Sequence, residues 1–327
     1  MSQQISDYSA YIAENFGANA SYVEGLLARY LADPASVDES WQAFFAEMLG
    51  KEHKVETLPQ KSSSAPTSTP PSTRLETPIT ENDEARPIVG PAKKIVENME
   101  ESLTVPTATS VRTMPVKLLE ENRRIINDHL ATRGLGKASL THIIAWAIVQ
   151  AAKTYPRMNH GFGIVGGVPS RIEHKHINLG IAIDIEKKDG SRSLLVPNIK
   201  NCEEMSFAEF FDKYNETVRK ARDGKLELAD FQGTTISITN PGTIGTVASN
   251  PRLMAGQSAI IATGAIEYPA EYQAMTPAAL SQLGISKVIT LTSTYDHRVI
   301  QGAESGLFLA RIHEYLIGKH NFYDQIF

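Results

Sequence analysis

The sequence predicts an α+β fold for residues 87–327, in which a mixed sheet is flanked by helices. Segments rich in β-branched residues alternate there with longer segments whose apolar residues recur at helical spacing. The segments do not repeat as a regular strand–helix unit, which favours a layered α+β arrangement. The composition of the 327-residue chain, with 42% hydrophobic and 21% charged residues, is typical of a soluble globular protein.

Two short amphipathic helices are predicted within residues 1–50, at 22–31 and 41–48, on either side of a break at Asp33–Pro34. They bury too little apolar surface to form a robust domain by themselves. Their apolar faces therefore dock either on another protein or on the main domain of the same chain, and the sequence leaves both open. One basic and seven acidic residues give this segment a net charge of −6, which favours a protein partner with a basic patch.

Residues 51–86 are predicted to be a flexible, disordered linker. Serine, threonine and proline dominate its centre, Ser62–Thr73, and few apolar residues are available for burial. The linker is expected to separate two functional units.

The remaining elements follow from periodicity and capping signals. Ser139 is placed to begin one helix and Pro156 to end it, and Ser206 with Glu209 forms a capping box that opens another. Alternating or β-branched apolar residues predict the strands. The predicted helices are 116–130, 140–151, 207–214 and 303–316, and the predicted strands are 179–185, 234–239, 258–264 and 288–294.

Gly163–Gly167 is rich in glycine but lacks the lysine and hydroxyl residue that grip phosphate and magnesium. A hairpin turn is the better interpretation than a phosphate loop.

Several classes of function are excluded by composition. Residues 51–327 carry 31 basic and 30 acidic residues, so no basic face for nucleic acid is expected. No apolar run is long enough to cross a membrane and no signal peptide is recognisable, so the expected location is the cytoplasm. The single cysteine, Cys202, excludes a disulfide within the chain and is expected to be a semi-buried thiol. His174 and His176 could share one face of a strand, but without a third ligand no metal site is predicted.

Asp296-His297-Arg298, followed by Gly302, is the most informative motif. It falls between the predicted strand 288–294 and the predicted helix 303–316, so His297 is expected on a tight turn. An ionisable imidazole at a strand-to-helix junction can reach a substrate and act as a general base.

Seven motifs in order make the chain from about residue 86 to 317 resemble the catalytic core of the dihydrolipoamide acyltransferases, the transacylase components of 2-oxo acid dehydrogenase complexes. The motifs are Ala151–Asn159, Asn178–Ala182, Leu195–Pro197, Ala221–Leu226, Ile238–Gly242, Gln257–Ile260 and Tyr295–Arg298. Ala221–Leu226 is most similar to the succinyl-transferring branch. The resemblance implies a chloramphenicol-acetyltransferase-like core that forms a homotrimer, with its active site between subunits.

The resemblance also implies the chemistry. The acyl group passes between the thiols of dihydrolipoamide and coenzyme A. A thiol with a pKa near roughly 8.5 is mostly protonated at neutral pH, so a base is needed, and this role falls to His297. The hydroxyl of Thr239 is implied to donate to the oxyanion that forms on the thioester carbonyl.

Gln301 departs from the family pattern, which has aspartate immediately before the glycine. An amide can hydrogen-bond, but it cannot stabilise an imidazolium by charge, so activity is expected to be reduced or tuned. Glutamine here is similar to the fused enzymes that join the acyltransferase core to a 2-oxoglutarate decarboxylase. Residues 17–41 likewise resemble the start of such decarboxylases.

Two domains that such systems use are not recognisable in the chain. Without a lipoyl domain, dihydrolipoamide is expected on another protein, and the implied partners are that protein, the decarboxylase and dihydrolipoamide dehydrogenase. Thiamine diphosphate and magnesium are expected only if a decarboxylase domain follows. The apolar segment Asn321–Phe327 resembles a cut or an interface more than a solvated terminus.

Two alternatives to an active succinyltransferase stay open. The core could be a catalytically weakened trimeric scaffold for a fused decarboxylase, with Gln301 marking the relaxed site. It could also be an acetyltransferase for a small molecule, although the decarboxylase-like N-terminus argues against this.

Overall fold

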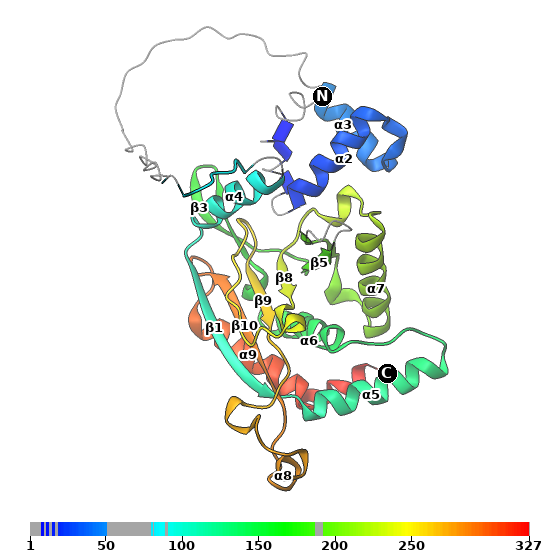
Figure 1. Ribbon diagram of the computed structural model, residues 1–327, viewed down its shortest axis with the longest axis vertical. Helices are drawn as coiled ribbons and strands as arrows, with labels where there is room; N and C mark the ends of the chain where they lie inside the picture. Colours follow the sequence, from blue (N-terminus) through cyan, green and yellow to red (C-terminus); the bar gives the residue numbers. More distant parts are fainter. Residues whose placement is uncertain are drawn as a thin grey trace.

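A six-stranded mixed sheet forms the centre of the molecule in the computed structural model, which describes residues 8–9, 11–12, 15–16, 19–50, 80, 82–88, 91–186 and 192–326. In sheet order the strands are β1 (Thr107–Pro115), β10 (Val288–Asp296), β9 (Ala259–Thr263), β8 (Ile236–Thr239), β4 (Leu179–Ile181) and β7 (Asn198–Ile199). The pairs β9–β8 and β8–β4 are parallel, whereas the other three pairs are antiparallel. The predicted mixed sheet is therefore confirmed (Figure 1).

Two hairpins lie outside this sheet, β2–β3 (Gly161–Val165 and Val168–Ile172) and β5–β6 (Ile183–Glu186 and Arg192–Leu195). Gly166 and Gly167 connect β2 to β3 with φ values of 57° and 81°, which a two-residue hairpin turn of this kind requires. The predicted hairpin is confirmed. The predicted strand 179–185 is divided at Ala182, because β4 belongs to the large sheet and β5 pairs with β6.

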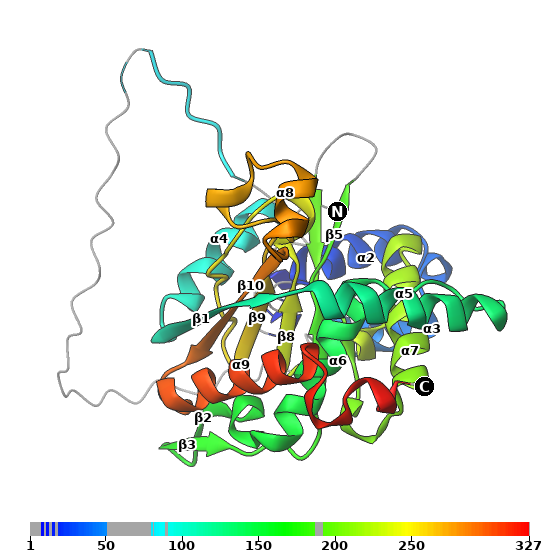
Figure 2. The ribbon, with the colours of Figure 1, turned by 90° about the horizontal axis from the view of Figure 1, so that it is seen from below.

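Helices cover the sheet and surround its edges. α9 (Gly302–Leu316) and α6 (Leu140–Thr154) lie side by side along one face, as Figure 2 shows. The other helices of this part of the chain are α4 (Pro91–Ser102), α5 (Lys117–Thr132), α7 (Phe207–Asp223) and α8 (Pro277–Gln282). Short 3₁₀ turns lie at 34–36, 156–159, 202–204, 228–230, 241–244, 270–272, 319–321 and 323–325.

Local capping signals begin the predicted helices where expected. The Ser139 hydroxyl accepts a hydrogen bond from the His142 backbone N–H, and the Ser206 hydroxyl accepts one from the Glu209 backbone N–H. The α6 helix is buried on almost all sides, because it packs against α9, α5 and α7. Each fully buried aliphatic side chain of this helix contributes about 1.5–3 kcal/mol to folding.

The N-terminal helices α2 (Ala20–Ala32) and α3 (Glu39–Gly50) pack on the main part of the same chain. The Trp41 indole N–H donates to the Leu226 carbonyl oxygen at 3.0 Å, and the Tyr22 and Phe231 rings lie 5.4 Å apart. Of the two docking arrangements left open above, the structure therefore shows docking within the chain. Figure 1 shows α2 and α3 next to one end of α7.

Two other predictions concern residues 51–86 and the C-terminal segment. Most of the predicted linker, residues 51–79, lies outside the described residues. The apolar segment near Phe327 was predicted to resemble a cut or an interface more than a solvated terminus. Phe322, Tyr323 and Ile326 are buried in the chain's own hydrophobic core, so these side chains are not solvated. The segment packs against α9, where the Tyr315 and Phe322 rings stack 5.1 Å apart.

In the part of the chain that is described, no helix is both long and apolar enough to traverse a lipid bilayer.

Candidate active site

Asp296 fixes the turn that carries His297. It is the last residue of β10, only 2% exposed, and its carboxylate accepts hydrogen bonds from Arg298 at the backbone N–H (3.0 Å) and at Nε (2.9 Å). Arg298 Nη2 lies 2.6 Å from the same carboxylate, and the guanidinium covers the Phe162 ring at 3.8 Å. Asp296 and Arg298, the two charged residues that flank His297, therefore pair with each other and hold the turn in place.

His297 itself is exposed at the end of β10. Its backbone N–H donates to the Pro106 carbonyl oxygen at 3.0 Å, and its ring lies edge-on to Tyr295 with the centroids 5.7 Å apart. Among the described residues, no side chain hydrogen-bonds to the imidazole. The backbone is fixed while the ring is free to meet a substrate, as a general base requires.

Gln301 lies at the N-cap of α9 and is exposed. Its backbone N–H donates to the Glu304 carboxylate at 3.0 Å, and Glu304 in turn pairs with Arg157 at 3.0 Å. Gln301 therefore helps to begin α9, the helix that follows His297.

Thr239 ends β8 and lines a cavity of about 600 Å³. Ser237, two residues earlier, lines the same cavity and donates its hydroxyl to the Gln257 side-chain oxygen at 3.0 Å. Residues i and i+2 of a strand point to the same face, which explains why both hydroxyl residues reach this cavity.

The turn after Thr239 depends on a close backbone approach. A Cβ atom on Gly242 would lie 2.2 Å from the Gly264 carbonyl oxygen, and one on Gly264 would lie 1.8 Å from the Val247 carbonyl oxygen. Only glycine allows these backbones to pack, so both positions support the end of β8.

Thr239 and His297 lie at opposite ends of the sheet. In the strand register Thr239 is level with Ala262, Ala262 is level with Thr292, and His297 follows five residues beyond. Five residues along a strand and two strand spacings correspond to roughly 20 Å between the two Cα atoms. Within one chain the predicted base and the predicted oxyanion donor are therefore not brought together.

The structure places the remaining histidine pair differently from the prediction. His174 and His176 lie in the connection between β3 and β4, not on a strand, so their predicted shared strand face is wrong. His174 lines the Thr239 cavity, where burial lowers the pKa of its imidazole. His176 Nδ1 lies 2.7 Å from Glu203 at the surface. No local sequence pattern predicts a site role for His174, because its approach to the cavity depends on the hairpin that precedes it.

Cys202 is fully buried, with its thiol 3.2 Å from the Ile199 carbonyl oxygen, and burial raises its pKa to about 12. It is therefore more deeply buried than the semi-buried thiol expected, and a nucleophilic role is excluded.

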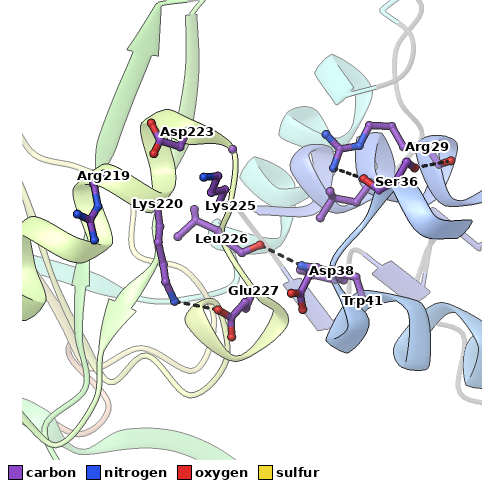
Figure 3. A pocket seen from close by; sticks show the side chains of 12 residues that line it. Arg29, Ser36, Asp38, Trp41, Arg219, Lys220, Asp223, Lys225, Leu226 and Glu227 are labelled. Atoms are coloured by element: carbon purple, nitrogen blue, oxygen red, sulfur yellow. Dashed lines mark hydrogen bonds and ion pairs between the residues drawn. The ribbon is translucent and has the colours of Figure 1, made fainter. Parts of the chain in front are cut away.

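A second cavity, of about 650 Å³, lies at the junction between the N-terminal helices and the end of α7. Figure 3 shows the Trp41–Leu226 hydrogen bond at its edge and the pair of Lys220 with Glu227 within it. Its lining mixes basic and acidic side chains, and none of the predicted catalytic residues reaches it.

The mixed sheet flanked by helices is the fold expected from the resemblance to an acyltransferase catalytic domain. The family model described as "2-oxoacid dehydrogenases acyltransferase (catalytic domain)" matches residues 80–322, and the chain belongs to this family. A second model, "2-oxoglutarate dehydrogenase N-terminus", matches residues 15–51. Both parts of the resemblance predicted from the sequence are therefore confirmed.

Two curated relatives carry the name "Multifunctional 2-oxoglutarate metabolism enzyme". The protein from Mycolicibacterium vanbaalenii is 45% identical over 357 residues, an alignment that covers 95% of this chain and 29% of the relative. The protein from Mycobacterium sp. strain JLS is 54% identical over 251 residues, covering 76% of this chain and 20% of the relative. The chain thus spans less than a third of the length of these relatives.

Solved structures confirm the predicted fold class. A probable dihydrolipoamide acetyltransferase from Listeria monocytogenes is 26% identical with a TM-score of 0.60, covering 76% of this chain and 97% of that one. A truncated 2-oxoacid dehydrogenase core from Thermoplasma acidophilum is 25% identical with a TM-score of 0.59, covering 73% and 100%.

Proposed function

We propose that the chain transfers a succinyl group between dihydrolipoamide, carried on the lipoyl domain of another protein, and coenzyme A. The observation that carries this proposal is the exposed His297 imidazole on a turn fixed by Asp296 and Arg298, within an acyltransferase catalytic domain. The name of the relatives, which refers to 2-oxoglutarate, supports succinyl as the acyl group, because decarboxylation of 2-oxoglutarate leaves a four-carbon acid.

The proposed step moves one proton and one acyl group. His297 accepts the proton of the attacking thiol, and the thiolate sulfur bonds to the thioester carbonyl carbon. The Thr239 hydroxyl donates a hydrogen bond to the oxyanion that forms. When the carbonyl re-forms, the bond to the original sulfur breaks, and the imidazolium returns the proton to the departing thiolate.

A homotrimer with its active site between subunits is part of this proposal. Thr239 and His297 of one chain lie roughly 20 Å apart, so a second copy is needed to bring a histidine to each Thr239. The hairpin β2–β3 exposes three apolar residues, Ile164, Val165 and Val168, each about 60% accessible, and such a patch suits a subunit contact.

The proposal includes the wider system. A lipoyl-domain protein, a decarboxylase and dihydrolipoamide dehydrogenase are its partners, and thiamine diphosphate with magnesium would belong to a decarboxylase domain. The division into 1–50, 51–86 and 87–327 is supported by one family match that ends at residue 51 and another that begins at residue 80. The cytoplasm is the proposed location, because the free thiols of coenzyme A and dihydrolipoamide, which the reaction uses, need a reducing compartment.

The test is thioester exchange between succinyl-dihydrolipoamide and coenzyme A. The parent should transfer the acyl group, and His297→Ala should lower the rate by about 10²–10⁴-fold. His320→Ala, which removes an exposed histidine that lies beyond the C-terminal end of α9 and pairs with Glu314, is the matched control and should leave the rate unchanged. Equal rates for the parent and His297→Ala would refute the assignment of the base.

The second candidate, a catalytically weakened scaffold, rests on Gln301 in place of the family's aspartate. Gln301→Asp restores the carboxylate at the N-cap of α9. A large gain in transfer rate would favour the scaffold with a decayed site, whereas a loss would favour a site built around the amide.

A further inference from the structure

One wall of the Thr239 cavity comes from the N-terminal segment. Asn15, Phe16 and Asn19 line it, together with Ser237 and Thr239 from β8. These three residues fall within the match to the 2-oxoglutarate dehydrogenase N-terminus, whereas β8 belongs to the acyltransferase domain. A single cavity is therefore built from both parts of the chain.

Asn19 is bound directly to the acyltransferase domain. It is 6% exposed, its side-chain oxygen accepts from the Val196 backbone N–H at 2.8 Å, and its amide donates to the Val196 carbonyl at 3.4 Å. Val196 also lines the cavity. Because both hydrogen-bonding groups of the amide are satisfied by one residue of the wall, the Asn19 side chain is held in a single orientation.

Phe16 belongs to an aromatic cluster that extends to the other wall. It is 4% exposed, and its ring lies 5.6 Å from Trp41, which is hydrogen-bonded to Leu226 (Figure 3). Trp41 in turn lies 6.5 Å from Phe231, which lines the cavity. Both ring pairs are tilted and within ordinary aromatic contact distance, so displacing Phe16 would disturb the packing of both walls.

The shape and lining suit an extended, flexible arm that ends in a thiol. Lining residues run from Thr234, two residues before β8, to Thr239 at the end of the strand, a stretch of about 17 Å of extended chain. Apolar side chains such as Met99, Leu194 and Met254 lie beside the hydroxyl residues. Coenzyme A and dihydrolipoamide each present their thiol on such an alkyl-amide arm.

We propose that the N-terminal helical segment is a working wall of the acyl-transfer cavity, in which Phe16 and Asn19 position the thiol-bearing arm of one substrate along β8 toward Thr239. This inference rests on the proposed function for the identity of the arm. The existence of the wall does not depend on the proposed function. A wall limits the access of chemical reagents to the cavity whether or not the chain transfers an acyl group.

The wall is tested by chemical access to the cavity. The native Cys202 is 0% exposed, so it should not react with a thiol reagent in the folded protein. Ala182→Cys, at a position that lines the cavity, therefore provides the one reactive thiol. A bulky aromatic disulfide should label this thiol about ten-fold faster when Phe16→Ala or Asn19→Ala is added, because either change opens the wall. Tyr11→Ala is the matched control: Tyr11 is 39% exposed on the same segment, does not line the cavity, and should leave the labelling rate unchanged.

Steady-state kinetics identify the arm. Phe16→Ala should raise the KM for either coenzyme A or dihydrolipoamide by about ten-fold and leave kcat within about two-fold, because a positioning wall acts on binding. The substrate whose KM rises is the one whose arm lies along β8. Phe16→Leu, which keeps an apolar side chain, should restore most of the lost affinity, and thermal unfolding checks that each variant is folded.

These experiments distinguish a failure of the proposed wall from a failure of the proposed function. Equal labelling rates in the parent and both wall variants would refute the wall, whatever the activity of the chain. Faster labelling with an unchanged KM for both substrates would refute the positioning role. An inactive parent whose wall variants label faster would contradict the proposed function while leaving the wall in place.

Discussion

At the scale of single residues, Asp296 determines where His297 stands. Its buried carboxylate holds Arg298 through the backbone and the guanidinium, so the turn between them has little freedom. This explains why a histidine without hydrogen-bonded side-chain partners among the described residues can still be placed accurately. The position of the proposed base is therefore set by its neighbours Asp296 and Arg298.

Asp296→Asn should therefore weaken both the fold and the chemistry. The amide keeps one acceptor but directs an N–H toward the Arg298 guanidinium, which should cost about 1–3 kcal/mol in the free energy of unfolding. Transfer activity should fall because the His297 turn loosens. Urea unfolding and thioester exchange measure the two effects. Full activity in a destabilised variant would show that Asp296 does not position His297.

His142 predicts a pH dependence of stability. The residue is buried in α6, with its ring near Asn215, and burial lowers its pKa from 6.5 to about 4. The unfolded chain binds a proton at this site first as the pH falls. Keeping His142 neutral therefore contributes fully to the free energy of unfolding above about pH 6.5. This contribution is lost progressively as the pH falls toward about 4, and it amounts to about 3 kcal/mol in total.

Replacing His142 isolates the effect of its imidazole on the pH dependence of stability. His142→Gln removes the titrating ring, so the free energy of unfolding of the variant should fall less than that of the parent between pH 6.5 and about pH 4. Denaturant unfolding across this window gives the difference between the two proteins. Parallel pH profiles would contradict a neutral, buried imidazole.

At the scale of elements, the turn after β8 is held by glycines. Gly264→Ala would place a Cβ within 1.8 Å of the Val247 carbonyl oxygen, so the two backbones must separate, at a cost of at least about 3 kcal/mol. The end of β8 should move with them, and the transfer rate should fall. Gly306→Ala is the matched control in α9, since nothing lies within 4 Å of its Cβ position and alanine should stabilise the helix by about 0.5–1 kcal/mol. Similar stability changes in the two variants would contradict the close approach.

The elements that the sequence predicted are those with local signals. The helix start at Ser139, the capping box at Ser206, the glycine hairpin and the apolar strand that became β10 all depend on residues near one another in the chain. The edge strand β1 was not predicted, because most of its residues are exposed or half-exposed, and threonines, a serine and an arginine interrupt any continuous apolar pattern. Its pairing with β10 joins residues about 180 positions apart.

The same distinction applies to the site. His297 and Thr239 could be assigned because each lies in a recognisable motif at the end of a strand. The distance between them depends on the sheet order β10–β9–β8, which no local pattern contains. The contribution of Asn19 to the cavity was likewise not predictable, because it depends on hydrogen bonds to Val196, 177 residues away.

At the scale of the whole molecule, the separation of Thr239 from His297 predicts complementation between inactive subunits. Each active site of the proposed trimer takes its hydroxyl from one chain and its imidazole from a neighbour. His297→Ala and Thr239→Ala should each be nearly inactive alone. After unfolding and refolding together in equal amounts, a site is intact when both of its donors are unmutated, which random mixing gives in about a quarter of interfaces.

The mixture should therefore recover about a quarter of the parental transfer rate. Sedimentation velocity establishes that the refolded species is trimeric, native mass spectrometry shows that its trimers contain both variants, and each variant refolded alone is the control for recovery caused by refolding itself. A site built within one chain would be restored in no mixture, because every chain lacks one of the two groups. Activity that stays at the level of the separate variants, in trimers shown to be mixed, would thus contradict the shared site and return the chemistry to a single subunit.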